Sequence, residues 1–117
     1  MSKGQKGIVR RFLIRLTRLS RAQLTRLVLM ERLALLYRSN EQYAEAVKVF
    51  EQMPQLDPDS GPRAAAQIAD TWRQAKEFAK AEQAADTAAQ KYPDNRVVKV
   101  VRSSVLADVG RVDEAAA

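Results

Sequence analysis

The sequence predicts an all-α fold, and three observations carry that prediction. Apolar residues recur at spacings of three and four along most of the chain, which is the period of an amphipathic helix. Alanine, the strongest helix former, accounts for 19 of the 117 residues. Glycine and proline, four of each, lie almost entirely between the apolar patterns, where they mark boundaries. No segment shows the β-branched alternation of a strand, so we expect helices alone.

The chain contains no histidine and no cysteine. This absence excludes serine or cysteine nucleophiles activated by a histidine base, Cys/His zinc sites, thiol redox centres and disulfides. The carboxylates fall mostly at expected turns or on exposed faces beside Lys or Arg, and no glycine-rich phosphate loop is present. We therefore expect a single small domain that is not an enzyme and that binds no cofactor and no metal.

The net charge of +6 is unevenly distributed along the chain. Residues 1–30 contain eight basic residues and no acidic residue, whereas residues 31–117 carry a net charge of −2. The sequence therefore consists of a basic amino-terminal segment, residues 1–26, joined to a mildly acidic body, residues 27–117.

The first expected helix covers residues 7–19 and has two distinct faces. Its apolar face carries Ile8, Val9, Phe12, Leu13, Leu16 and Leu19. Its opposite face forms a basic arm of Arg10, Arg11, Arg15, Arg18 and Arg21. The residues from Ser20 to Gln23 have the form of a capping box, so a second helix is predicted to begin there and to run through Tyr37.

An internal repeat follows. A shift of 35 residues matches Ala34, Tyr37, Tyr43, Ala46 and Pro58 with Ala69, Trp72, Phe78, Ala81 and Pro93. A further shift of 34 matches Ala69, Trp72, Phe78 and Ala81 with Ser103, Leu106, Val112 and Ala115. A period near 34 that combines small, aromatic and closing proline positions is typical of a helical-hairpin repeat.

With these positions the chain resembles the tetratricopeptide repeat family over residues 27–117. The resemblance implies a short right-handed α-solenoid of antiparallel helix pairs, with units at about 27–60, 62–94 and 96–117. The third unit departs from the family pattern at Lys99 and Arg102, and is expected to turn near Gly110 and to stop one turn into its second helix. Ala34, Ala46, Ala69 and Ala81 are expected where the two helices of a unit cross closely.

In this family the first helices of successive units line a concave groove that binds protein or peptide partners. The matched positions predict a groove of Arg32, Leu35, Arg38, Ser39, Arg63, Gln67, Asp70, Arg73, Gln74, Val101, Ser104 and Asp108. Four arginines make its first half basic, so an acidic peptide is the expected partner. The Lys and Asn clamp that grips chaperone tails is absent, because its positions hold Glu31, Leu35, Gln67, Val97 and Val101.

The basic amino-terminal segment has four interpretations. It can cap the repeat stack, since Val9, Phe12, Leu16 and Leu19 match apolar positions of a second helix one period later. It also fits an organellar targeting sequence, a membrane-surface helix or a non-specific nucleic-acid contact. The alternative to groove binding is therefore an arm that anchors the domain to anionic membrane or nucleic acid.

The valine-rich stretch at residues 97–106 is expected to leave apolar surface uncovered. We expect either that the sequence is part of a longer repeat array or that a partner or a second copy covers this surface. No apolar run approaches the ~20 residues of a membrane span, and no secretory signal is evident. A soluble, cytoplasmic protein is the expectation.

Overall fold

The computed structural model describes the backbone of residues 19–116 and the side chains of residues 19–111. This part of the chain is helical, without strands, and the all-α prediction is confirmed. The elements are α2 (Arg21–Ser39), α3 (Tyr43–Leu56), the short 3₁₀ helix η1 (Pro58–Ser60), α4 (Gly61–Gln74), α5 (Phe78–Lys91) and α6 (Arg96–Ala116). The helix expected over residues 7–19 lies outside the described residues, except for Leu19.

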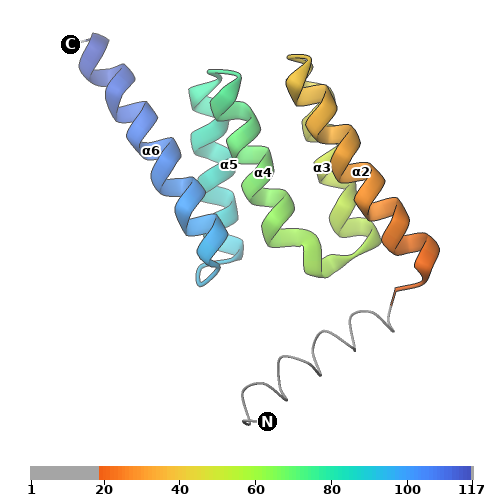
Figure 1. Ribbon diagram of the computed structural model, residues 1–117. Helices are drawn as coiled ribbons and strands as arrows, with labels where there is room; N and C mark the ends of the chain where they lie inside the picture. Colours follow the sequence, from red (N-terminus) through yellow and green to blue (C-terminus); the bar gives the residue numbers. More distant parts are fainter. Residues whose placement is uncertain (1–18, 117) are drawn as a thin grey trace, which may run out of the picture.

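The helices form a stack of two layers (Figure 1). In that view α2, α4 and α6 form the nearer layer, and α3 and α5 lie behind it. Each first helix packs against the second helix of its own unit, α2 on α3 and α4 on α5. The units are joined by packing of α3 against α4, and α6 packs against both α4 and α5. This arrangement is the helix-pair stack that the repeat predicts.

The start of α2 confirms the predicted capping box. The Ser20 hydroxyl oxygen accepts a hydrogen bond from the Gln23 backbone N–H at 3.1 Å, and the Gln23 side chain accepts one from the Ser20 N–H at 2.8 Å. Leu19 is buried in the same core cluster against which Leu24 packs. A hydrophobic residue just before the cap that packs near the fourth helical residue fixes how the chain enters the helix.

The turns inside the first two units have the same backbone geometry. Glu41 and Lys76, which are 35 residues apart, both adopt left-handed φ values, 62° and 61°. In both turns the following residue donates a backbone hydrogen bond to the aromatic residue of the first helix, Gln42 to Tyr37 at 2.8 Å and Glu77 to Trp72 at 3.0 Å. The repeat seen in the letters is therefore also a repeat of turn conformation.

Small residues lie at the helix crossings, as the sequence predicts. Ala34, Ala46, Ala69 and Ala81 are fully buried. Phe50, which is 1% exposed, is the largest fully buried side chain of the core. Alanine at a crossing lets two backbones approach closely, and the aromatic side chains fill the space beside that contact.

The end of the chain differs from the sequence prediction. The expected turn near Gly110 is absent, and α6 continues as one helix from Arg96 to Ala116. The first two turns each depend on a residue in the left-handed region, whereas Gly110 has no positive φ and leaves the helix uninterrupted. The interpretation of these last residues as a turn and a second helix was therefore wrong.

The valine-rich stretch is only partly uncovered. Val98 and Val105 are completely buried, one against Ala66 and Ala88, the other against α4 and α5. Val97, Val100 and Leu106 on the same helix are exposed, as expected. α6 therefore closes the core of the second unit with one face and presents apolar side chains to solvent with another.

Candidate functional site

Charged residues of the three first helices meet on one side of the stack. We call this surface the first-helix face and define it by Arg38 of α2, Asp70 and Arg73 of α4, and Asp108 and Arg111 of α6. Positive and negative side chains alternate along this run, and α4 and α6 each contribute one of either sign. The predicted groove positions on these helices are thus brought together in space, although they lie up to 70 residues apart in the sequence.

Arg38 links the first unit to the second. Its Nη1 donates a hydrogen bond to Gln67 Oε1 at 2.9 Å and lies 3.5 Å from Asp70 Oδ2. The Arg38 side chain is 17% exposed and that of Asp70 is 20% exposed, so both are partly shielded from water. An ion pair in such a position is screened less than one on an open surface.

Arg73 continues the chain of contacts to α6. Its Nε and Nη2 both donate to Asp70 Oδ1, at 3.0 and 2.7 Å, and its Nη1 donates to Asp108 Oδ2 at 3.2 Å. The hydrogen bond with Asp70 is the main cause that raises the pKa of Arg73 above its usual value. Arg73 therefore keeps its charge at any pH that the folded protein meets.

The first-helix face is less basic than its arginine positions alone indicate. Arg38 and Arg73 share Asp70, and Arg73 and Arg111 share Asp108, with Arg111 Nη1 at 3.6 Å from Asp108 Oδ1. These arginines are already paired within the protein. A carboxylate of a partner would have to compete with Asp70 and Asp108 for the same guanidinium groups.

The remaining predicted groove residues fall into two groups. Arg63 pairs with Glu31, Gln74 donates to Asp70 at 3.2 Å, and Arg32 is exposed. Leu35 and Val101 instead pack against the core clusters, and the hydroxyls of Ser39 and Ser104 donate to backbone carbonyls one helical turn earlier. The side chains of this second group are therefore less available to contact a partner than the sequence prediction assumed.

Two residues that pair with predicted groove residues were not themselves predicted. Arg111 of the first-helix face contacts Asp108, and Glu31, outside that face, pairs with Arg63. Both pairs could have been predicted from their spacing in the sequence. Arg111 follows Asp108 by three residues on one helix, and Glu31 precedes Arg63 by about one repeat length, so each pair lies within reach. The acidic positions of a repeat have to be compared with the basic ones before a groove is assigned a charge.

The acidic residues of the described part form no cluster of three or more that would suit a metal ion. The one buried carboxylate, Asp57, has a structural role: its Oδ1 accepts from the Asp59 N–H at 3.2 Å, and its carbonyl accepts from the Ser60 hydroxyl at 2.7 Å. None of the described helices is long and apolar enough to cross a membrane.

The stacked helix pairs and the polar face shared by their first helices define the class of this protein as a helical-repeat protein. The family model described as tetratricopeptide repeat matches residues 37–104, which is more than half of the chain. The chain therefore belongs to the tetratricopeptide repeat family, as its sequence resemblance implied. Comparison with curated proteins and with solved structures gave no match.

Proposed function

We propose that this chain is a non-catalytic scaffold that binds a protein or peptide partner across the first-helix face. Repeats of this family generally mediate protein–protein interaction. The observation that supports this face most strongly is the run of alternating charges from Arg38 through Asp70, Arg73 and Asp108 to Arg111. Polar side chains from three helices are held there in fixed positions, which favours recognition of a partner with a matching arrangement of charges.

An acidic peptide is the partner class that this face fits best. The face contains Arg38, Arg73 and Arg111 against Asp70 and Asp108, so it keeps one positive charge in excess. Arg32 is exposed on α2 and adds long-range attraction for a negatively charged chain, whereas the charge of Arg63 is already balanced by Glu31. Arginine binds carboxylates through two parallel hydrogen bonds, which gives such a contact both strength and direction.

Charge reversal tests the proposal. The double variant Arg38→Glu/Arg73→Glu would be compared with Lys48→Glu/Lys99→Glu, which changes the net charge equally at exposed positions on α3 and α6. We expect proteins captured from a cell extract by the wild type and by the lysine variant to be lost from the arginine variant. Circular dichroism must show that all three proteins remain helical. Equal capture by the arginine variant would refute the proposal.

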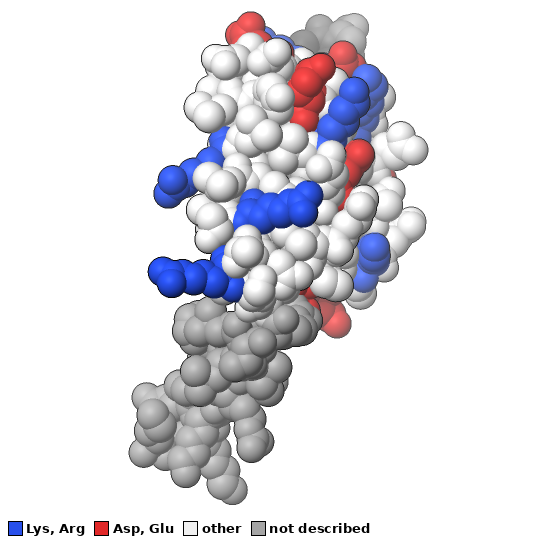
Figure 2. All heavy atoms as spheres, turned by 90° about the vertical axis from the view of Figure 1, so that its right-hand side faces the viewer, with Lys and Arg blue, Asp and Glu red and all other residues white. Residues whose placement is uncertain are grey.

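A second candidate is the attachment of the chain to an anionic membrane surface. On α2, Val28, Leu29, Leu33 and Leu36 are 43–62% exposed. Figure 2 shows this side of the stack as a largely uncharged area with basic side chains across it and several acidic side chains toward its upper and right edges. Arg21, the one residue of the basic arm that lies in the described part, is exposed at the start of the same helix. An apolar face with an arginine border is typical of interfacial helices.

Vesicle binding tests this candidate. We expect the full chain to float with phosphatidylserine vesicles but not with phosphatidylcholine vesicles, and to be released as salt rises. Removal of residues 1–18 should weaken binding, while Leu19 has to stay because it is buried in the core. Equal flotation with both lipids, or flotation insensitive to salt, would contradict this candidate.

A further inference from the structure

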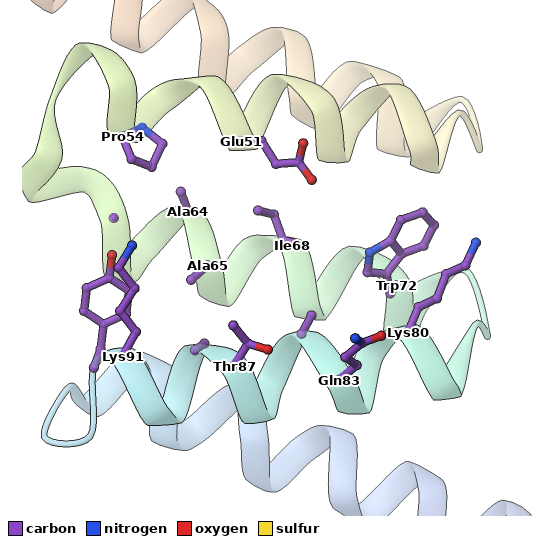
Figure 3. A pocket seen from close by; sticks show the side chains of 14 residues that line it. Glu51, Pro54, Ala64, Ala65, Ile68, Trp72, Lys80, Gln83, Thr87 and Lys91 are labelled. Atoms are coloured by element: carbon purple, nitrogen blue, oxygen red, sulfur yellow. The ribbon is translucent and has the colours of Figure 1, made fainter.

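A recess lies between α3 and α5, with α4 as its floor (Figure 3). We call it the α3–α5 groove. Its volume is about 530 Å³, and its floor is formed by small or aliphatic side chains, among them Ala64, Ala65 and Ile68. Glu51 and Pro54 line the α3 side, and the longer polar side chains of α5 line the other.

The hollow arises because the second unit has lost side-chain volume relative to the first. Under the shift of 35 residues, four larger residues of the first unit correspond to glycine or alanine in this groove. The matched pairs are Arg26 and Gly61, Met30 and Ala65, Val49 and Ala84, and Met53 and Ala88. In the first unit Met30, Val49 and Met53 pack into or against the core cluster. The second unit therefore keeps the backbone of the repeat and leaves this space unfilled.

The two ends of the groove are aromatic, and each carries a lysine. Lys80 Nζ lies 4.7 Å from the centre of the Trp72 ring, and Lys91 Nζ lies 5.6 Å from the centre of the Tyr92 ring. Gly61 makes room at one end, because a side chain at that position would overlap the Tyr92 hydroxyl. Glu45 and Leu56 occupy the lysine positions in the first unit, so this pair of cations belongs to the second unit alone.

We propose that the α3–α5 groove binds an extended peptide segment in which two acidic residues flank a short aliphatic stretch. The aliphatic side chains would fill the space above Ala65 and Ala84. The acidic side chains would lie toward α5, beside Lys80 and Lys91 and away from Glu51. This occupant is chosen on charge complementarity and on the volume that the matched side chains fill in the first unit.

The spacing of the lysines sets the length of the segment. Eleven residues of helix separate Lys80 from Lys91, which corresponds to about 16 Å at about 1.5 Å per residue. An extended chain covers that length in about five residues, at about 3.3 Å per residue. Gln83 and Thr87 lie between the two lysines, and among the described residues their side chains form no hydrogen bond that would occupy them. They are free to bond to a peptide backbone.

The test uses a synthetic probe and the single tryptophan of the chain, Trp72. The probe is a capped pentapeptide with glutamate at both ends and three aliphatic residues between them, because residues an even number apart lie on the same side of an extended chain. The comparison peptide has lysine at both ends. We expect a saturable change in Trp72 fluorescence with the glutamate peptide and at least tenfold weaker binding of the lysine peptide. Amide NMR spectra recorded in the same titration provide a second readout.

Two variants connect binding to the groove. Ala65→Met/Ala84→Val restores the first-unit side chains and should weaken the glutamate peptide at least tenfold, whereas Ala44→Met on the exposed side of α3 should not. Lys80→Glu/Lys91→Glu should reverse the preference and favour the lysine peptide. The matched control is Lys48→Glu/Lys99→Glu, which should keep the peptide preference of the wild type.

The proposal is overturned if neither fluorescence nor NMR detects saturable binding of the glutamate peptide. It is also overturned if Ala65→Met/Ala84→Val binds that peptide as well as the wild type does, or if Lys80→Glu/Lys91→Glu and Lys48→Glu/Lys99→Glu change the peptide preference to the same extent. The proposal is independent of the first-helix face. The arginine reversal that tests that face should leave binding of the pentapeptide unchanged, since neither Arg38 nor Arg73 lines this groove.

Discussion

Asp70 is the shared partner of two arginines. Its replacement by asparagine should lower the stability of the fold and raise the affinity for an acidic partner. Asp70→Asn removes the negative charge that Arg38 and Arg73 both face, at 3.5 and 2.7 Å, and keeps the size of the side chain. The side chains involved are 17–30% exposed, between open surface and buried core. At about 1 kcal/mol or less for each pair, the loss of both should lower the free energy of unfolding by up to about 2 kcal/mol.

The same change should strengthen the binding of an acidic partner. Both arginines lose the Asp70 carboxylate as a competitor, so a carboxylate of the partner binds them more readily, while Arg73 keeps its contact with Asp108. A gain of about 1–1.4 kcal/mol corresponds to about a fivefold to tenfold lower Kd. Urea unfolding followed by circular dichroism measures the first effect, and calorimetric titration with the captured partner measures the second.

Asp86→Asn is the matched control for this experiment. It breaks the Arg102–Asp86 pair, whose side chains are 46% and 45% exposed and which belongs to α5 and α6 rather than to the first-helix face. We expect little change in stability or affinity from it. If Asp70→Asn leaves the affinity for the partner unchanged or lowers it, the idea that Asp70 competes with the partner for the two arginines is refuted.

Three further predictions concern the fold and are checked by urea unfolding. Phe50→Ala should lower the free energy of unfolding by about 3–5 kcal/mol, because it leaves a cavity in the first-unit core; a loss below 1 kcal/mol would contradict this packing. Ala46→Leu should cost about 1–3 kcal/mol by overpacking a helix crossing, whereas Ala44→Leu at an exposed position should stay within about 0.5 kcal/mol. Ser20→Ala should cost about 1 kcal/mol through the lost cap, and an unchanged midpoint would show that the cap is dispensable.

The fold was largely predictable from the sequence because its determinants are local and repeated. Ala34, Ala69 and their partners recur at a fixed period, and each is buried where the repeat places it. The capping box at Ser20 is a pattern of four residues, so its presence needed no tertiary information. The error near Gly110 arose where the prediction followed the period alone, although no left-handed residue is present there to end the helix.

The site was less predictable because its properties depend on pairs of residues far apart in the chain. The positions of Arg38 and Arg73 followed from the repeat, but their sharing of Asp70 depends on side-chain reach across two helices. Similarly, alanines in the second unit were visible in the sequence, but the hollow they leave depends on how α3 and α5 are placed around α4. The alanines in the sequence indicate that the second unit has lost side-chain volume, but only the packing of the helices shows where the resulting groove lies.

Position-specific cross-linking tests the central claim most directly. The natural chain has no cysteine, so a single Gln74→Cys substitution places a photoactivatable label beside the first-helix face, and Gln90→Cys places the same label on exposed α5. If the first-helix face binds the partner, the captured partner should cross-link from position 74 and not from position 90. Cross-linking from position 90 alone would contradict the proposed face.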